Sequence, residues 1–184
     1  NYLKQDVAEL AKNKEAITTG SRLFSTYCTQ CHGSDAGGGP GFPNLRDGKW
    51  LWGGDVAQIK QTITAGRMGA MPAWGAVLGD DGVKNVTAYV MSLSGRKTAG
   101  DLDAGKEKFQ QLCVACHGAE AKGNVALGAP DLTDETWLYG SSRRSIEKSI
   151  IEGRTGRMPA FGDFLGEGKV HLLTAYVYSL SVED

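Results

Sequence analysis

Cys28-Thr29-Gln30-Cys31-His32 is the stretch that decides how this chain folds, and Cys113-Val114-Ala115-Cys116-His117 repeats it. Two thiols at this spacing can add across the two vinyl groups of one porphyrin, and the adjoining histidine can then reach the iron. Each stretch therefore predicts one covalently attached haem, with His32 and His117 as the proximal iron ligands. Cys28, Cys31, Cys113 and Cys116 account for all the cysteines of the chain.

A methionine followed by proline occurs at a similar distance after each motif. Met71 lies 39 residues after His32, and Met158 lies 41 residues after His117. A thioether opposite an imidazole favours ferrous over ferric iron. We therefore expect Met71 to be the distal ligand of the iron held by His32. Met158 is expected to play the same part for the iron held by His117. Four cysteines could also form a zinc site or disulfides, but neither explains the paired methionines.

The similarity of the two halves extends beyond these ligands and indicates a duplicated module. Gly20 recurs 85 positions later as Gly105, and Tyr89 recurs 87 positions later as Tyr176. We expect the first and last helices of each module to cross at the glycine, with an aromatic side chain packed over it. This arrangement would place Tyr89 on Gly20, and Tyr176 on Gly105.

The repeat predicts two tandem domains, residues 1–95 and 96–184, each wrapped around one haem. Segment 94–100 is short and polar, and it would serve as the linker. Asp6, followed three residues later by a glutamate, predicts an extra helix at about residues 6–14 that has no copy in the second half. Apolar residues recur at helical spacing and no alternation typical of strands is found, so we expect an all-α fold with long loops.

Further residues could support the haems. The second ring N–H of each proximal histidine needs an acceptor, and the carbonyl groups of Pro43 and Pro130 are suitably placed in the sequence. Other residues could bind haem propionates, although plain packing or solvent exposure explains each of them equally well. They are Trp50, Trp52, Trp137, Tyr139, Arg67 and Arg154. His171, the third histidine, falls off the apolar stripe of its helix and is expected at the solvated surface.

Composition argues against two classes of function. The formal net charge is −1, and basic and acidic residues are nearly balanced, so binding of nucleic acid has no electrostatic support. No stretch approaches the roughly 18 consecutive apolar residues of a membrane-spanning helix. Because the chain starts at Asn1 and carries no such stretch, we expect it to be a soluble, processed or trimmed piece.

The order of these elements resembles that of class I cytochromes c, over residues of about 16–94 and 101–181. More narrowly, several strings resemble the dihaem subunit, CcoP or FixP, of cbb3-type cytochrome c oxidases. They are Asp6-Val7-Ala8-Glu9-Leu10-Ala11, Phe42-Pro43-Asn44-Leu45, Trp50-Leu51-Trp52-Gly53-Gly54, Met71-Pro72-Ala73-Trp74-Gly75 and Thr136-Trp137-Leu138-Tyr139-Gly140.

The resemblance implies two haem c groups and a respiratory electron relay, from a soluble donor to the catalytic subunit of the oxidase. It also implies a periplasmic location and an upstream membrane anchor that this chain lacks, and no enzymatic activity of the chain by itself. Two alternatives remain open. One is a free periplasmic dihaem carrier, and the other is a dihaem enzyme such as a peroxidase, which needs an open or displaceable iron position.

Overall fold

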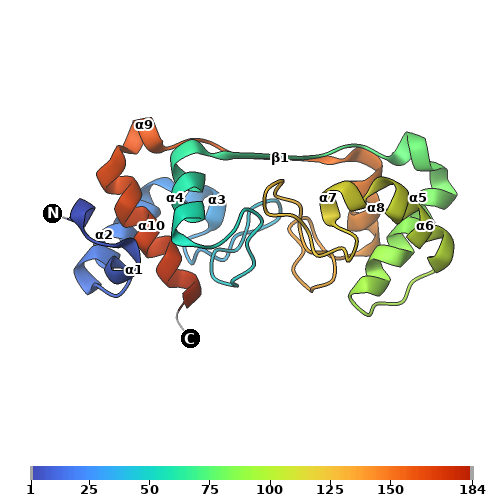
Figure 1. Ribbon diagram of the computed structural model, residues 1–184, viewed down its shortest axis with the longest axis horizontal. Coiled ribbons are helices and arrows are strands. Elements are labelled where there is room, and N and C mark those ends of the chain that lie inside the picture. Colours follow the sequence, from blue (N-terminus) through green and yellow to red (C-terminus); the bar gives the residue numbers. More distant parts are fainter. Residues whose placement is uncertain (1, 183–184) are drawn as a thin grey trace. The chain divides into compact units, whose positions relative to one another are not determined.

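The computed structural model describes residues 2–182 and is mainly helical (Figure 1). Within these residues, no helix combines the length and the apolar character needed to cross a membrane. In chain order the elements are η1 (Tyr2–Lys4), α1 (Val7–Leu10), α2 (Lys14–Tyr27), α3 (Thr29–His32), α4 (Val56–Ala65), β1 (Arg67–Met71), α5 (Gly75–Leu93), α6 (Leu102–Leu112), α7 (Val114–His117), α8 (Arg143–Glu152), β2 (Arg154–Met158), α9 (Gly162–Leu165) and α10 (Glu167–Val182).

A small two-stranded sheet corrects the all-α prediction. Strands β1 and β2 lie 87 positions apart in the sequence and are hydrogen-bonded to each other. Residues in both strands alternate between half-buried and exposed. They are mostly arginine, glycine, threonine, alanine and methionine, however, and lack the run of branched and aromatic residues by which strands are recognised. The fold is therefore helical with one small sheet.

The N-terminal segment differs from the single helix expected at about residues 6–14. Asp6 caps α1 as predicted, because its side chain accepts hydrogen bonds from two backbone N–H groups of that helix. Helix α1 nevertheless ends at Leu10. The side chain of Asn13 then accepts hydrogen bonds from two N–H groups of α2, which starts a second helix at Lys14.

The chain forms two compact units whose boundaries differ from the expected ones. Unit 1 combines the residues up to Met68 with those from Arg157 onward, and unit 2 is Gly69–Gly156. The two sequential domains expected, 1–95 and 96–184, are therefore not the compact units of the structure. Asn1 and residues 183–184 lie outside the described residues.

The last helix of each sequence copy, here called a closing helix, accounts for this difference. Closing helix α10 packs against α2 and α4 in unit 1, whereas closing helix α5 packs against α6 and α8 in unit 2 (Figure 1). Each closing helix thus belongs to the unit that carries the cysteine motif of the other copy. Because the copies share their core residues, either closing helix finds a similar apolar surface in both units, and the repeat alone does not distinguish the two pairings.

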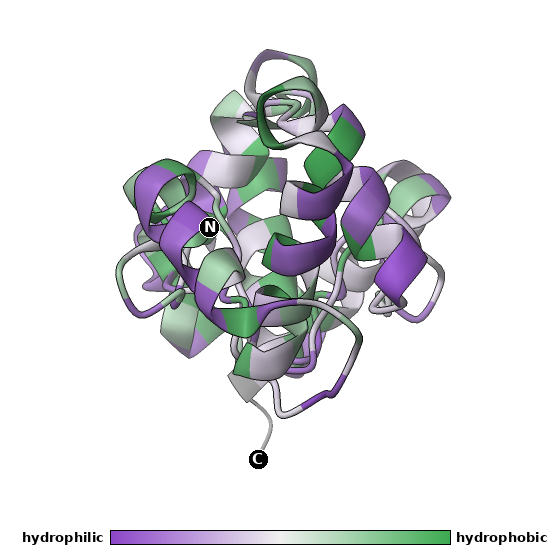
Figure 2. Ribbon diagram, turned by 90° about the vertical axis from the view of Figure 1, so that its right-hand side faces the viewer, coloured by the Kyte–Doolittle hydropathy of each residue, from purple (hydrophilic) through white to green (hydrophobic). Residues whose placement is uncertain are grey.

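Each unit has its own apolar core. Figure 2 shows that single helices carry both hydrophobic and hydrophilic residues, which is the pattern of amphipathic helices that bury one face. The core of unit 1 includes Phe24, Ile59, Ile63, Val170, Leu173 and Val177. The corresponding core of unit 2 includes Phe109, Ile146, Ile150, Val83, Val86 and Val90.

Candidate haem-attachment sites

In unit 1 the first cysteine motif begins where α2 ends. The N–H of Cys28 donates to the carbonyl of Phe24, which closes α2 and turns the chain into the short helix α3. His32, at the end of α3, is only 9% exposed. Its Nδ1 lies 3.0 Å from the carbonyl oxygen of Pro43, the contact expected from the sequence. An Nδ1–H that donates to this carbonyl leaves Nε2 with a free lone pair, as an iron ligand requires.

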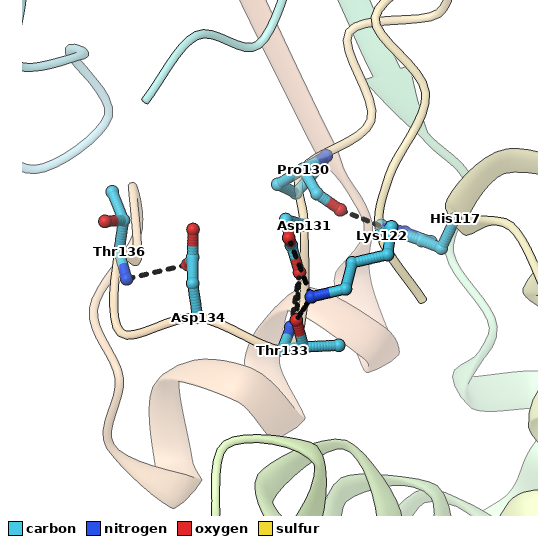
Figure 3. A network of polar contacts seen from close by, with 7 residues as sticks. All are labelled: His117, Lys122, Pro130, Asp131, Thr133, Asp134 and Thr136. Carbon is cyan, nitrogen blue, oxygen red and sulfur yellow. Dashed lines mark hydrogen bonds and ion pairs between the residues drawn. The ribbon is translucent and has the colours of Figure 1, made fainter. Parts of the chain in front are cut away.

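Unit 2 repeats this arrangement around the second motif. His117 is 8% exposed, and its Nδ1 lies 3.2 Å from the carbonyl oxygen of Pro130 (Figure 3). Burial lowers the pKa of both His32 and His117, while the hydrogen bond to the proline carbonyl acts in the opposite direction. The net lowering of the pKa favours the neutral imidazole, which is the form that binds a metal.

The loop that presents the Pro130 carbonyl is held by a polar network (Figure 3). Asp131 accepts hydrogen bonds from the backbone N–H of Thr133 at 2.7 Å and from its hydroxyl at 2.6 Å. Lys122 donates to the same hydroxyl and lies 3.6 Å from the carboxylate. Burial alone would raise the pKa of Asp131, but these hydrogen bonds and the nearby ammonium group hold it below its usual value. At the matching position of unit 1, Asn44 accepts one backbone hydrogen bond from Arg46, so this position carries a negative charge only in unit 2.

The four cysteines are not bonded to one another. Cys28 and Cys113 are half-buried, whereas Cys31 and Cys116 are exposed. Burial, followed by the neighbouring cysteine of the same motif, raises the pKa of both Cys28 and Cys113 to about 11. In the absence of a bond to another group, burial therefore favours the thiol over the thiolate at both positions. Among the described residues, no group of three or more histidine, cysteine or acidic side chains is placed to hold a metal ion.

The two methionines lie in the opposite units from those expected. Met158 packs against the core of unit 1, as does Cys28. Met71 packs against the core of unit 2, as does Cys113. The structure thus brings Met158 together with the first cysteine motif and Met71 with the second, which corrects the pairing expected from the sequence order. The reason is that β1 and β2 each carry the chain from one unit to the other before the methionine is reached.

The aromatic and arginine candidates form stacked pairs within their units. Arg67 stacks on Trp52 with its guanidinium carbon 5.0 Å from the ring centroid, and Arg154 stacks on Tyr139 at 4.4 Å. The side chain of each arginine also donates to polar groups of the preceding helix. Trp50 and Trp137 pack against the cores of units 1 and 2, respectively. These contacts support a packing role for the aromatic side chains and fix the direction of both guanidinium groups.

Sequence reasoning missed Arg96 as a candidate. Its guanidinium carbon lies 4.9 Å from the ring centroid of Trp137, and it donates to Ser94 and to the carbonyl of Ser141. One terminal nitrogen of Arg96 is buried without a hydrogen-bond partner in the protein. A buried guanidinium N–H without a partner fits a site for an anionic group such as a propionate. Arg96 lies in the linker outside the repeat, so no internal match drew attention to it.

His171 is buried and not solvated, which corrects the prediction for this residue. It is 6% exposed, and its Nε2 lies 3.0 Å from the carbonyl oxygen of Gln5. The N-terminal segment covers this face of α10, and local periodicity in α10 could not reveal that cover. His171 is thus a structural residue of unit 1.

Each unit therefore offers the donors that a covalently bound haem requires: two thiols, an imidazole with a free nitrogen, and a thioether against the same core. This donor set on short helices, enclosed by amphipathic helices, defines the class of c-type cytochromes.

Comparisons with known proteins narrow the class. The family "Cytochrome C oxidase, cbb3-type, subunit III" matches residues 15–90 and 100–177, and the chain belongs to this family. It is 47% identical to the cbb3-type cytochrome c oxidase subunit CcoP of Rubrivivax gelatinosus, over 98% of this chain and 60% of the relative. It is 43% identical to the subunit FixP of Azorhizobium caulinodans, over 94% of this chain and 64% of the relative. The chain thus spans a little under two thirds of the length of these relatives.

Proposed function

We propose that the chain binds two haem c groups and relays electrons from a soluble donor toward the catalytic subunit of a cbb3-type oxidase. Cys28 and Cys31 would hold one haem, and Cys113 and Cys116 the other. The observation that carries the proposal is the repeated pair of a buried, neutral histidine and a neighbouring cysteine motif, with Nδ1 of the histidine tied to a proline carbonyl. A bound haem supplies one-electron chemistry between ferrous and ferric iron.

The protein residues would fill both axial positions of each iron. His32 and His117 would bind through Nε2, since Nδ1 is engaged by the carbonyl groups of Pro43 and Pro130. Met71 and Met158 would occupy the opposite positions. With no open position left, a substrate cannot bind to the iron, which suits electron transfer rather than catalysis. Because both histidines are buried, water would have little access to compete with them for the iron.

Charged side chains around each site would bind the propionates. Arg67 and Arg154 are oriented by their stacking on Trp52 and Tyr139. The unpartnered nitrogen of Arg96 supports a further contact in unit 2. Because this extra positive group lies in unit 2 only, the balance between reduced and oxidised iron would differ between the two units. The proposal therefore predicts that the two haems have unequal reduction potentials.

The proposed partners follow from the relatives, which are named as subunits of cbb3-type oxidases. Covalent haem attachment takes place outside the bacterial inner membrane, so the proposed location is the periplasm. A free periplasmic carrier uses the same haem chemistry, and binding to the purified oxidase core separates the two: a carrier does not co-purify with it.

Ligand substitution tests the proposal. We expect Met71→Ala and Met158→Ala each to remove about half of the far-red absorption band that arises from sulfur bound to ferric iron, and to lower the potential of one haem. Met68→Ala is the matched control, because Met68 lies in the same strand as Met71 but is 71% exposed. An unchanged band in both ligand variants would refute the assignment.

Carbon monoxide distinguishes the relay from a dihaem enzyme. If both irons are closed by methionine, carbon monoxide added to the reduced protein at neutral pH leaves the visible spectrum almost unchanged. Rapid stoichiometric binding at either haem would instead favour an enzyme such as a peroxidase, because such an enzyme needs an accessible iron.

A further inference from the structure

We propose that Arg96 binds a propionate of the haem on the second cysteine motif and raises the reduction potential of that haem. This role rests on the haem attachment proposed above. It assigns to one residue of the linker an effect on one haem only, and it gives that effect a sign. The two copies of the repeat would thereby hold electronically unequal haems.

Hydrogen bonds and an aromatic ring fix the direction of the Arg96 side chain. Its Nε–H donates to the hydroxyl of Ser94 at 3.1 Å, and one terminal nitrogen donates to the carbonyl of Ser141. The guanidinium carbon lies 4.9 Å from the ring centroid of Trp137. The backbone N–H donates to the carbonyl of Met91 at 3.1 Å, which ties the residue to the end of α5. Because the guanidinium group is already oriented, binding a further partner costs little additional ordering.

The second terminal nitrogen of Arg96, Nη2, is buried and lacks a hydrogen-bond partner among the described residues. Buried N–H groups are normally paired, because an unpaired one costs free energy. The acceptors of the other side-chain N–H groups, a hydroxyl and a carbonyl, are both neutral. Within residues 2–182 no carboxylate forms an ion pair with Arg96, whereas Arg143 has its Nε 2.7 Å from Glu147. The described part of the chain therefore leaves the charge of Arg96 uncompensated, and an anion would be its natural partner.

Trp137 connects this guanidinium group with the haem site of unit 2. The indole packs against the core of unit 2, as do Cys113 and Met71. Arg96 thus stacks on a side chain that borders the second haem site. The propionates are the only anionic side groups of a haem, and a carboxylate is the group that matches a guanidinium in geometry and charge. A propionate therefore fits the unpaired nitrogen.

Unit 1 lacks this arrangement. The tryptophan that matches Trp137, at an offset of 87 residues, is Trp50, and among the described residues no arginine stacks on it. Gly54 occupies the position of Ser141 at the same offset. Its backbone lies so close to Trp50 that an added Cβ would be 2.2 Å from Cδ1 of the indole. The two tryptophans therefore have different neighbours, and only the one in unit 2 carries a cation.

The other stacked arginines do not distinguish the units. Arg67 on Trp52 in unit 1 matches Arg154 on Tyr139 in unit 2, again at an offset of 87. Each of these arginines also donates through Nε to a hydroxyl of the preceding helix, at 2.9 Å in both units. Contacts from this pair to propionates would act alike on both haems. Arg96 is thus the stacked arginine that occurs in one unit only.

The sign of the effect follows from the charges. Ferric haem carries one positive charge more than ferrous haem, so a nearby carboxylate stabilises the ferric form. Arg96 would compensate this carboxylate through a charge-assisted hydrogen bond. Its positive charge then favours the ferrous form and raises the reduction potential. Removal of the charge should lower the potential of the haem on the second motif and leave the other potential almost unchanged.

Potentiometric titration of the two-haem protein tests this role. We expect Arg96→Gln to lower one midpoint potential and to change the equilibrium constant for electron exchange between the haems by about tenfold, the order expected for one unit charge in partly buried surroundings. For one electron, this factor corresponds to about 59 mV. Two unchanged potentials would overturn the role of Arg96 and leave the proposed relay intact. Failure of the parent chain to bind haem would instead refute the proposed function, so the two failures are distinguishable.

Matched variants separate a charge at the haem from other effects. Lys97→Gln removes the same charge at the next residue, which is exposed, and should leave both potentials unchanged. Thr98→Val removes the hydrogen bond from Arg143 to the linker without a change of charge, and should also leave both unchanged. Arg96→Lys keeps the charge but loses the planar donor group, so it should restore part of the potential. A fall as large as that of Arg96→Gln in either of the first two variants would overturn the proposal.

Single-haem variants assign the effect to one haem. The double variant Cys28→Ala, Cys31→Ala keeps only the haem on the second motif, and there Arg96→Gln should lower the single potential. The double variant Cys113→Ala, Cys116→Ala keeps the other haem, and there the same substitution should have no effect. The reverse result would overturn the assignment to unit 2.

A measurement on the unmodified protein does not depend on the folding of variants. In the reduced, diamagnetic state with labelled arginine, we expect slowly exchanging Nη–H protons of Arg96 and nuclear Overhauser contacts from them to the propionate methylene groups of one haem. A free anion is the other source of such a partner, and inorganic phosphate added at constant ionic strength distinguishes the two. An Arg96 signal that follows the phosphate concentration and shows no contact with a propionate would overturn the proposal.

Discussion

Replacing Gly20 by alanine tests the closest approach between helices in unit 1. The added Cβ would lie 2.6 Å from the Cβ of Tyr176 and 2.7 Å from the carbonyl oxygen of Leu172, where ordinary contact begins at 3.4 Å. Neither atom can move without moving α10, because one is backbone and the other is the first side-chain atom. Overpacking of this kind lowers the free energy of unfolding by about 1–3 kcal/mol. The higher helix propensity of alanine offsets about 1 kcal/mol of this loss. The rigid neighbours favour the upper part of this range, so we expect a net loss of about 1–2 kcal/mol.

Thermal unfolding of the two-haem protein, followed by circular dichroism, measures this loss. For a chain of this length, about 1–2 kcal/mol corresponds to a fall in Tm of roughly 2–8 °C. Gly168→Ala is the matched control, since Gly168 lies in α10 and nothing lies within 4 Å of its added Cβ. The control should be neutral or more stable by up to about 1 kcal/mol. A Gly20→Ala protein as stable as the parent would show that α10 does not cross α2 at this glycine.

Three further substitutions probe the loops, the helix caps and the N-terminal segment. Asp131→Asn removes the ion pair with Lys122, which is largely exposed and so contributes only about 0.5 kcal/mol at neutral pH. Because the pKa of Asp131 is depressed in the folded state, this contribution is present above the unfolded pKa. It is lost as pH falls through the folded pKa, so urea titrations of variant and parent should converge in acid; a constant difference would contradict the ion pair. Asp55→Ala removes the capping box at the start of α4 and should cost about 1 kcal/mol by the same assay, whereas an unchanged midpoint would argue against the cap. Leu10 is fully buried, so Leu10→Ala should cost about 2–4 kcal/mol, against less than about 0.5 kcal/mol for Val77→Ala at a site 65% exposed. Equal losses in these last two variants would refute the packing of the N-terminal segment.

Short-range chemistry made part of the site predictable. The spacing of the cysteines and the neighbouring histidine predicts haem attachment independently of the tertiary contacts of the rest of the chain. The contacts of His32 with Pro43 and of His117 with Pro130 were also expected, because they span only 11 and 13 residues within one copy. Such contacts depend on a short loop whose ends are already close together.

Long-range contacts were the ones that could not be predicted. The burial of His171 depends on a carbonyl 166 positions away in the sequence. The partner of strand β1 lies in the other copy, and the unpartnered nitrogen of Arg96 is evident only when its surroundings are known. Periodicity reports which face of a helix is apolar, but it does not report what covers the other faces.

The amino-acid sequence by itself determined the chemical groups of this protein: two cysteine motifs, two proximal histidines, two methionines and the amphipathic helices around them. Only the tertiary structure decided which closing helix, and hence which methionine, lies with which cysteine motif. The physical reason is the duplication. Both copies present nearly the same apolar surface, so the position of each closing helix depends on the few residues that differ between the copies. Asn85 and Leu172 are such residues, and their partners are known only from the tertiary structure.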